Sequence, residues 1–275
     1  MPELPEVETV KTGLEKRFLN KKITKVTHSD KKLRHPLPEN IVQILQGATI
    51  KQFYRRAKVL FIHLDNGHSL IFHLGMTGKI VFDISTVAEH LHKHNHFSIY
   101  FDDETYFIFN DIRRFGYVDL CKTTDIEKLD YIKSLAPEPL TDEFNVNYLY
   151  EKLKNKQTAI KVAIMDNPTV VGVGNIYACE SLFKAKIHPK IPANQVSKKK
   201  LEILVTEIKE TLKIAIAKGG STLKDYVQAD GSLGYFQHEF FTYGRHNEDC
   251  KVCGTKIDKI TLGQRSTFFC PKCQK

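Results

Sequence analysis

The sequence predicts an α+β protein of several domains: an N-terminal antiparallel β-sandwich with a leading helix, a helical domain, and a C-terminal zinc-ribbon hairpin. Three observations predict it. Short segments rich in β-branched and aromatic residues fill the first half, helical periodicity fills the second, and two pairs of cysteines occupy the tail. At 275 residues, 41% of them hydrophobic, the chain can form two or three domains with cores of their own.

The leading helix is expected over residues 5–20. Its apolar side chains recur every three or four positions and so share one face: Val7, Val10, Leu14 and Phe18. Proline is common in the first turn of a helix, which suits Pro2 and Pro5. Such a helix would give the N-terminal residues a fixed base.

Short strands are expected after this helix. Six segments are rich in Ile, Val, Phe and Tyr: residues 59–64, 69–74, 79–83, 97–101, 106–109 and 117–120. Residues 65–67 (Asp-Asn-Gly) and 102–104 (Asp-Asp-Glu) have the composition of hairpin turns between neighbouring strands. Many short strands joined by short turns predict an antiparallel sandwich or a barrel.

The second half is expected to be helical up to the cysteines. Helical spacing covers residues 146–156, 158–166, 175–185 and 197–218, and Gly219-Gly220 ends the last of them. A loop rich in Gly, Ser and Asp follows at residues 221–236. We therefore expect three domains: the β-sandwich at 1–134, the helical domain with this loop at 135–240, and the cysteine module at 241–275.

The charge of the chain indicates a polyanionic partner. Lys and Arg number 41 against 32 Asp and Glu, a net charge of +9. Nucleic acid and an anionic membrane surface both fit this excess. No apolar run reaches the roughly 18 residues of a membrane-spanning helix. The acidic N-terminus lacks the apolar segment of a signal peptide, so we expect a cytoplasmic protein.

The cysteine tail predicts a structural zinc site. Cys250 and Cys253 form one pair, Cys270 and Cys273 another, and 16 residues separate the pairs, as in zinc sites made of four cysteines. Four thiolates leave no open position on the metal. Two disulfides are the alternative, which an intracellular location disfavours. Arg265, between the pairs, can reach a phosphate or equally be a solvated charge.

The first eight residues, Met-Pro-Glu-Leu-Pro-Glu-Val-Glu, contain a second candidate site. Removal of Met1 would leave Pro2 with a free secondary amine beside the carboxylate of Glu3. An α-amino group has a pKa of about 7.7–8.0, against ~10.4 for lysine, so more of it is unprotonated and nucleophilic at neutral pH. On these residues alone two interpretations stay open: Pro2 as a nucleophile, or prolines that merely open a helix.

These motifs together resemble one family. The N-terminal Pro-Glu-Leu-Pro-Glu-Val-Glu, the cysteine quartet and residues 166–183, with Gly172, Gly174 and Asn175, are similar to bacterial formamidopyrimidine-DNA glycosylases. The resemblance extends over essentially the whole chain, and residues 166–183 match the family's helix–two-turn–helix. Taken alone, the Gly-x-Gly stretch could be a tight turn or a phosphate site at the N-terminus of a helix.

The resemblance implies a bifunctional DNA glycosylase and abasic-site lyase that removes oxidised purines, 8-oxoguanine and formamidopyrimidines. Pro2 would attack C1′ and form a Schiff base, and Glu3 would protonate the sugar. Lys58 would donate a proton in β-elimination. Without the resemblance, residues 55–58 would indicate only a basic surface. Arg265 would grip phosphates and serve δ-elimination. Glu6 would orient the amine or favour the helix dipole.

Further matches concern the DNA. Four residues match positions that contact DNA in the family: His94, Arg113, Lys156 and Asn175. His73 and Tyr243 are candidates for binding phosphate groups. Met76, Arg113 and Phe115 resemble the triad that fills the hole left by an everted nucleotide, although a lone Met or Phe is more often core. Residues 221–236 match the loop over the flipped base. The histidines at 90–96 could bind a metal, but their irregular spacing favours DNA contact.

Two other kinds of protein are alternatives. Endonuclease VIII shares the N-terminal proline but typically begins Pro-Glu-Gly-Pro-Glu, whereas this chain has Leu4 and resembles the purine-specific branch. The other is a zinc-ribbon DNA-binding protein without enzymatic activity, which the charge and the tail alone would also fit.

We expect a monomer with one structural Zn²⁺ that acts on double-stranded DNA with oxidised purines or abasic sites, binds no membrane, and lies in the cytoplasm with the nucleoid.

Overall fold

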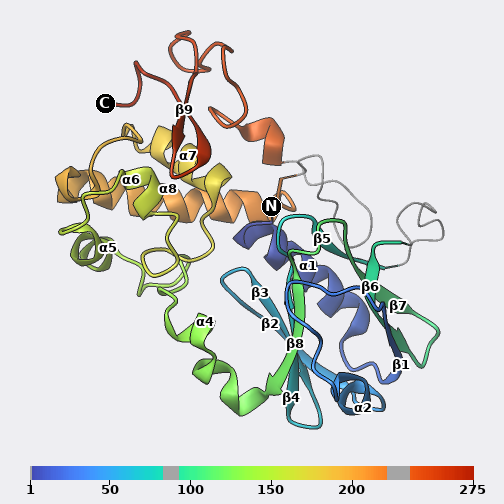
Figure 1. The fold of residues 1–275 in the computed structure, drawn as a ribbon. Coiled ribbons are helices and arrows are strands. Elements are labelled where there is room, and N and C mark those ends of the chain that lie inside the picture. Colours follow the sequence, from blue (N-terminus) through green and yellow to red (C-terminus); the bar gives the residue numbers. More distant parts are fainter. Residues whose placement is uncertain (1, 83–92, 222–235) are drawn as a thin grey trace. The chain divides into compact units, whose positions relative to one another are not determined.

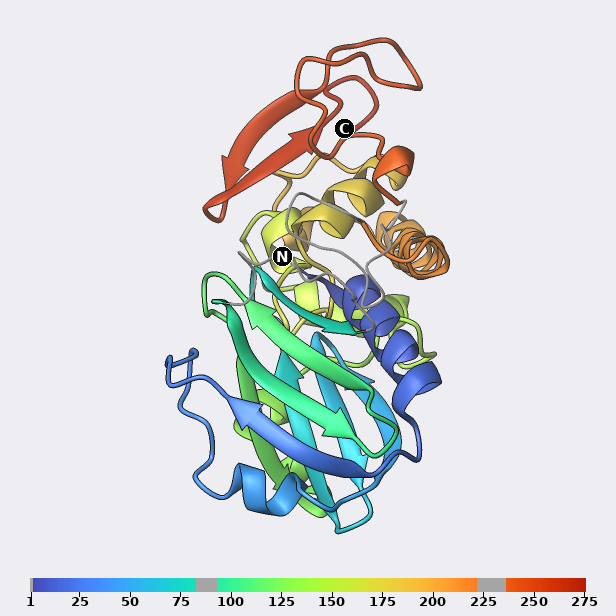
Figure 2. The ribbon, with the colours of Figure 1, turned by 90° about the vertical axis from the view of Figure 1, so that its right-hand side faces the viewer.

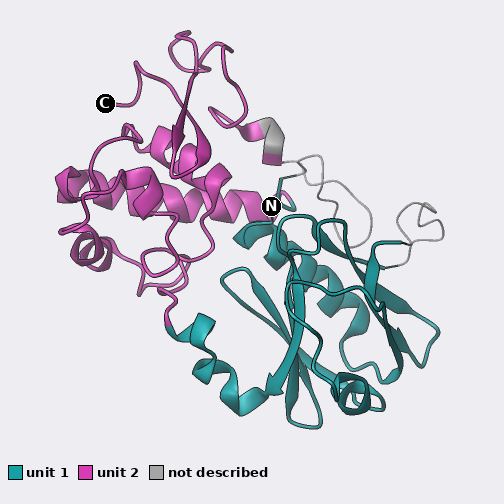
Figure 3. Cartoon of the chain, viewed as in Figure 1, with its two compact units in different colours: residues 1–133, 219–235 teal, residues 134–218, 236–275 magenta. Residues whose placement is uncertain are grey.

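The computed structural model describes residues 2–82, 93–221 and 236–275 (Figure 1). The chain forms two compact units (Figure 3). The first comprises Met1–Lys133 with Gly219–Tyr235, and the second comprises Ser134–Lys218 with Phe236–Lys275. The helical segment and the cysteine tail thus share one unit, and the division into three domains stays a prediction.

The first unit is the sandwich that the strand pattern predicts. One sheet has the order β1-β6-β7-β5 and the other β2-β3-β4-β8, all antiparallel. The strands are β1 (Ile23–His28), β2 (Ile50–Arg56), β3 (Val59–Leu64), β4 (His68–His73), β5 (Gly78–Phe82), β6 (Asn95–Phe101), β7 (Tyr106–Asp111) and β8 (Tyr117–Lys122). Both expected hairpin turns, at residues 65–67 and 102–104, join paired neighbours, β3 with β4 and β6 with β7.

The leading helix runs along the sheets (Figure 2). Helix α1 spans Leu4–Phe18, and its expected apolar face is fully buried in the core of the sandwich. At its C-terminal end the Phe18 ring stacks on Phe101 and meets Phe82 and Phe107 edge-on, with centroids 4.7–5.4 Å apart. The shorter elements of this unit are α2 (Ile41–Leu45), η1 (Thr123–Lys128) and α4 (Asp130–Lys133).

Two loops cross from one sheet to the other at the same end of the sandwich. Residues 74–77 join β4 to β5, and residues 112–116 join β7 to β8. Because His73 pairs with Tyr117 and Gly78 pairs with Asp111, both ends of one crossover lie beside the ends of the other. The two crossovers therefore run side by side.

The second unit is helical with a C-terminal hairpin. Its elements are α5 (Val146–Leu153), α6 (Ile160–Ala163), α7 (Asn175–Lys184), η2 (Ala193–Gln195), α8 (Lys198–Ala217), η3 (Phe236–Glu239), β9 (Asp258–Leu262) and β10 (Arg265–Phe269). Asn145 and Ser197 cap α5 and α8 by accepting hydrogen bonds from backbone N–H groups. The helix expected over 158–166 is a single turn, α6. No helix among the described residues is sufficiently long and apolar to traverse a bilayer.

Candidate active site and zinc centre

The N-terminal segment of the first unit is buried and held in place. Pro2 and Glu3 precede α1, and the exposed fraction of Glu3 is 2%. Glu3 is the N-cap of α1 in a reciprocal capping box with Glu6: the Glu3 backbone N–H donates to Glu6 Oε2 over 2.8 Å. The expected fixed base for Pro2 is therefore present, while Met1 lies outside the described residues.

Glu6 has a second set of partners far along the chain. Its Oε1 accepts hydrogen bonds from the backbone N–H of Ser221 at 2.8 Å and the Ser221 hydroxyl at 3.1 Å. Gly220, with φ +78°, lies so close that a Cβ there would sit 2.9 Å from Glu6 Oε1. Glu6 thus ties the start of α1 to residues 220–221. Residues 222–235 of the expected lesion loop lie outside the described residues, and its last residue, Phe236, begins the short helix η3.

Lys58 occupies a two-residue turn between β2 and β3. Ala57 has φ +53°, and its carbonyl accepts a 2.9 Å hydrogen bond from the Arg55 guanidinium. Arg55 Nε also donates to Glu8 on α1 over 2.6 Å. Burial raises the pKa of Glu8, but the bonds and charges of Arg55 and Lys11 outweigh it and hold this pKa below its usual value. The pair Glu8–Arg55 therefore fixes the Lys58 turn relative to α1.

His73, at the end of β4, is held as a neutral imidazole. Burial, together with the charges of Lys58 and Arg34, lowers the pKa of His73 to about 4. The Gly75 N–H donates to Nδ1 over 3.1 Å, so the ring proton sits on Nε2. The Tyr117 ring stacks on the imidazole with centroids 5.2 Å apart and 6° between the planes. A neutral donor of this kind suits a phosphate oxygen.

The three residues of the expected wedge lie on the two crossovers. Phe115 is 44% exposed, Met76 is half-buried and Arg113 is exposed. The Arg113 guanidinium lies 4.6 Å from the centroid of the Phe115 ring, a cation–π contact. His94 is near these loops through its backbone, because its carbonyl accepts from the Asp111 N–H at 3.0 Å. His90 and His92 lie outside the described residues.

In the second unit, Lys156 and Arg265 line one groove of about 480 Å³. Arg265 is exposed at the start of β10, after a turn in which Gly263 and Gln264 have φ +53° and +59°, the left-handed pair of a tight hairpin. Lys156 Nζ donates to Asp166 Oδ2 and to Thr169 Oγ1, both at 2.8 Å. A phosphate at Lys156 would therefore compete with a carboxylate already there.

Asn175 links two elements of the second unit at the start of α7. Its Nδ2 donates to the Ser266 carbonyl on β10 over 2.8 Å, and its Oδ1 accepts from Nζ of the fully buried Lys161. Gly174, the N-cap, has no side chain to cap the helix, and the positive end of the helix dipole at this terminus suits an anion. The side chain expected to contact DNA thus also fixes the zinc hairpin against α7.

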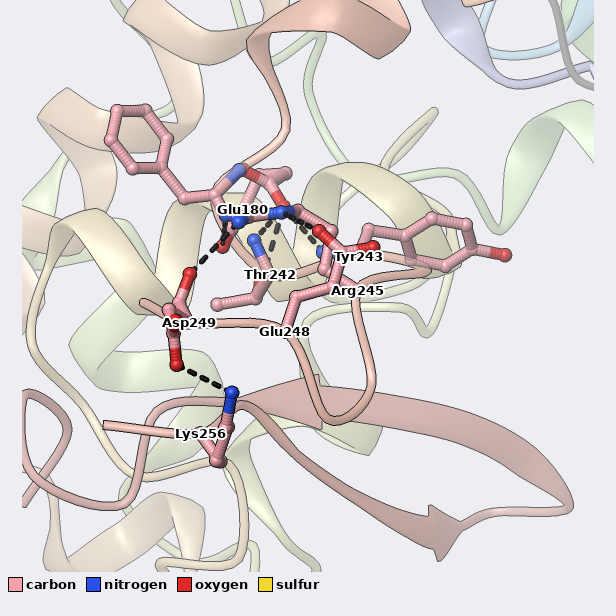
Figure 4. A network of polar contacts seen from close by, with 8 residues as sticks. Glu180, Thr242, Tyr243, Arg245, Glu248, Asp249 and Lys256 are labelled. Atoms are coloured by element: carbon pink, nitrogen blue, oxygen red, sulfur yellow. Dashed lines mark hydrogen bonds and ion pairs between the residues drawn. The ribbon is translucent and has the colours of Figure 1, made fainter. Parts of the chain in front are cut away.

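Glu180, on α7, is a residue that sequence reasoning missed (Figure 4). Only 1% exposed, it accepts hydrogen bonds from three successive backbone N–H groups, those of Phe241, Thr242 and Tyr243, at 2.8–2.9 Å. The Thr242 hydroxyl adds a fourth at 3.2 Å. The carboxylate therefore holds the segment 241–243, with which the cysteine module begins.

Beyond that segment, one arginine braces the chain up to the first cysteine (Figure 4). Arg245 donates to the Phe241 carbonyl at 2.8 Å, to Glu248 at 2.8 Å and to the Asp249 carbonyl at 2.9 Å. The Tyr243 ring packs edge-on against Phe240 and Phe268, with centroids 5.6 and 5.2 Å apart. Tyr243 is thus set by both its backbone and its ring.

The four tail cysteines converge as the zinc pattern predicts. Their sulfur atoms all lie within 4.8 Å of one another, with 3.5 Å between Cys253 and Cys270 and 3.9 Å between Cys250 and Cys273. A tetrahedral zinc with Zn–S bonds of about 2.3 Å requires sulfurs about 3.8 Å apart. None of these cysteines is in a disulfide. The donor set fits one structural zinc and leaves no position for a reacting water.

Comparisons with known proteins agree with this geometry. Three family models match the chain: "Formamidopyrimidine-DNA glycosylase N-terminal domain" over residues 1–118, "Formamidopyrimidine-DNA glycosylase H2TH domain" over 135–227, and "Zinc finger found in FPG and IleRS" over 247–275. The formamidopyrimidine-DNA glycosylase of Acinetobacter baylyi is 47% identical over 274 residues, which cover 100% of this chain and 98% of that protein.

Solved structures are similar over the same extent. A Lactococcus lactis Fpg variant in complex with DNA containing Fapy-dG superimposes with a TM-score of 0.90 at 35% identity, covering 100% of both chains. The L. lactis Fpg bound to DNA with an abasic site gives a TM-score of 0.89 at 35% identity, covering 99% of each chain.

Proposed function

The chain belongs to the formamidopyrimidine-DNA glycosylase family, and from this premise we propose how its residues divide the reaction. It is a DNA repair enzyme, a bifunctional glycosylase and abasic-site lyase, and it carries one structural zinc. The full-length match argues against the zinc-ribbon protein without enzymatic activity. For the substrate we propose duplex DNA with oxidised purines, 8-oxoguanine and formamidopyrimidines, on the chromosome in the cytoplasm.

We assign the covalent chemistry to Pro2 and Glu3. Once Met1 is removed, the Pro2 nitrogen attacks C1′ of the damaged nucleotide, and the bond from C1′ to the base breaks. Glu3 supplies the proton that opens the sugar ring, which leaves a positive iminium between Pro2 and C1′. The observation that carries this assignment is the buried start of α1, where the Glu3–Glu6 capping box fixes both residues.

The iminium makes the proton at C2′ acidic, so its loss expels the 3′ phosphate. We assign to Lys58 the proton transfer of this β-elimination, and to Arg265 the grip on phosphate and the δ-elimination that follows. The Glu8–Arg55 pair supports the first role because it fixes the Lys58 turn. The exposed position of Arg265 at the tip of the zinc hairpin supports the second.

We propose that the remaining site residues hold the DNA. His73, as a neutral donor, and Tyr243 bind phosphates, and Asn175 offers the N-terminus of α7. Lys156 and His94 add contacts to the backbone, and Met76, Arg113 and Phe115 fill the space of the extruded nucleotide. Burial of such groups against bases offsets an unstacking cost of a few kcal/mol.

The test is cleavage of a duplex that carries 8-oxoguanine opposite cytosine. We expect the Met1-processed enzyme to cut the damaged strand, and Pro2→Gly to cut it at least a hundredfold more slowly, because the secondary amine is gone. Lys16→Gln, an exposed change on the same helix, is the control and should match the unaltered enzyme. Equal rates for Pro2→Gly and the unaltered enzyme would refute the assignment of the nucleophile.

A further inference from the structure

The carboxylate of Asp111 joins the two crossovers that carry the wedge residues. Asp111 is the last residue of β7 and is fully buried. Its Oδ1 accepts from the Thr77 hydroxyl at 2.5 Å, and its Oδ2 accepts from the Gly116 N–H at 2.8 Å. A carboxylate accepts such bonds more strongly than a neutral group does. One side chain thus binds the Met76 loop (residues 74–77) and the Phe115 loop (residues 112–116) together.

The contact with the Phe115 loop extends to the wedge residue Arg113. Its backbone N–H is shared between Thr77 Oγ1 at 3.0 Å and Asp111 Oδ1 at 3.2 Å. Thr77 is therefore donor to the carboxylate and acceptor from the opposite loop. The Thr77 hydroxyl, the Asp111 carboxylate and the Arg113 N–H form a closed cycle of hydrogen bonds. Neither loop can move by itself without breaking one of these bonds.

The backbone of Asp111 is itself held by hydrogen bonds to His94 and His96. Its backbone N–H donates to the His94 carbonyl at 3.0 Å, and its carbonyl accepts from His96 Nε2 at 2.9 Å. The far end of the Phe115 loop is also tied, because the Gly116 carbonyl accepts from the Arg34 N–H at 3.2 Å. The carboxylate is thus a fixed point of the sandwich.

The glycines of the two loops leave no space between them. A Cβ on Gly75, which has φ +64°, would lie 2.5 Å from the Gly116 nitrogen, and a Cβ on Gly116 would lie 2.7 Å from the His73 carbonyl oxygen. Real Cβ atoms do not approach so closely, so backbone packs directly on backbone here. The loops are in contact as well as hydrogen-bonded.

We propose that Asp111 is a positioning residue that holds Met76, Arg113 and Phe115 as one preassembled wedge. This inference rests on the proposed function. Ordering the loops during folding removes a cost that would otherwise fall on insertion into DNA, as for any preorganised site. Both loops then enter the duplex together, because neither can shift without breaking the cycle around Asp111.

The two activities of the enzyme depend differently on such a wedge. A base-paired lesion must be unstacked and extruded before its C1′ is reached, whereas an abasic site has no base to extrude. Loosening the wedge should therefore slow base excision more than strand cleavage at a preformed abasic site. A general loss of folding would slow both to the same degree.

The experiment compares single-turnover rates on an 8-oxoguanine:cytosine duplex and on a duplex with a preformed abasic site. Asp111→Asn leaves one acceptor oxygen for donors on both loops, and Thr77→Val removes the hydroxyl at nearly constant volume. We expect either change to slow excision at least tenfold and abasic cleavage less than threefold. Thr77→Ser, which keeps the hydroxyl, should stay within twofold of the unaltered enzyme on both duplexes.

The matched control is Asp119→Asn, which changes a half-buried carboxylate on β8 that accepts a 2.8 Å hydrogen bond from the next backbone N–H, that of Leu120. It should leave both rates unchanged. Equal slowing on the two duplexes, or undiminished excision in Thr77→Val and Asp111→Asn, would overturn the positioning role. An unaltered enzyme that cleaves neither duplex would instead overturn the proposed function.

Discussion

Replacing Glu180 tests how the cysteine module is attached to helix α7 within the second unit. Glu180→Ala removes the acceptor of three backbone N–H groups and of the Thr242 hydroxyl, whereas Glu180→Gln keeps one oxygen. Because Oε1 accepts three of the four bonds, the glutamine oxygen can retain those three. Its NH₂ group then faces the Phe241 N–H, donor against donor.

The magnitudes follow from these bonds. A buried donor left without an acceptor costs about 1–3 kcal/mol. The three backbone N–H groups left without an acceptor would lower the free energy of unfolding by up to ~9 kcal/mol. Phe241 and Tyr243 are half-buried, however, so water can reach part of the space that the side chain leaves. We expect a loss of about 4 kcal/mol in the free energy of unfolding for Glu180→Ala and about 2 kcal/mol for Glu180→Gln.

The assay is urea unfolding of the zinc-loaded protein, with zinc release to a coloured chelator as the signal from the second unit. The control is Glu210→Gln, an exposed carboxylate on α8 paired with Lys213 at 2.9 Å, which should change the free energy by less than about 0.5 kcal/mol. If both Glu180 variants release zinc at the same urea concentration as the control, the brace that Figure 4 shows does not hold the module.

Three further perturbations have expected outcomes. Arg55→Met should release the Lys58 turn and slow strand cleavage at a preformed abasic site about tenfold. Arg17→Met is the control, and equal cleavage rates for the two variants would contradict the role of Arg55. Cys253→Ser should weaken DNA binding at least tenfold by displacing Arg265 while the sandwich stays folded; full affinity in a zinc-free sample would refute this. His73 is neutral in the folded protein and charges more readily when unfolded, so its contribution to stability is present above pH 6.5 and is lost as the pH falls toward 4. The gap in unfolding free energy between the unaltered protein and His73→Gln should shrink by about 3 kcal/mol from pH 7 to pH 4, and a constant gap would contradict the neutral state.

Local patterns in the sequence predicted the elements that have strong periodicity. Residues 59–64 match β3 in full, because a run of β-branched and aromatic residues ends there in Asp-Asn-Gly. β1 and β2 were not predicted, since Lys, Thr and Gln occupy their exposed positions and dilute the apolar signal. Over residues 158–166 the apolar side chains have helical spacing, but only Ile160–Ala163 form a helix, the single turn α6. The next residue, Ile164, is also buried, although it lies outside the helix.

Motifs in the sequence predicted the residues to which we assign the chemistry, but not the residues that position them. Asp111 and Arg55 look like ordinary charges at strand ends, and their roles depend on partners in other strands that no spacing reveals. Glu180 did carry a signal: it is the only acidic residue of α7 and stands among apolar and small side chains, Ile176–Cys179 before it and Ser181–Phe183 after it. A carboxylate in such a setting needs several donors, and that need could have been anticipated.

The central claim is that the nitrogen of Pro2 forms the covalent bond to DNA. The most direct measurement is borohydride reduction of the enzyme during reaction with an 8-oxoguanine:cytosine duplex, followed by mass spectrometry of the linked peptide. We expect one adduct, attached to Pro2 in protein that has lost Met1 and absent from protein that keeps it. An adduct on a lysine, or none from fully processed protein, would contradict the claim.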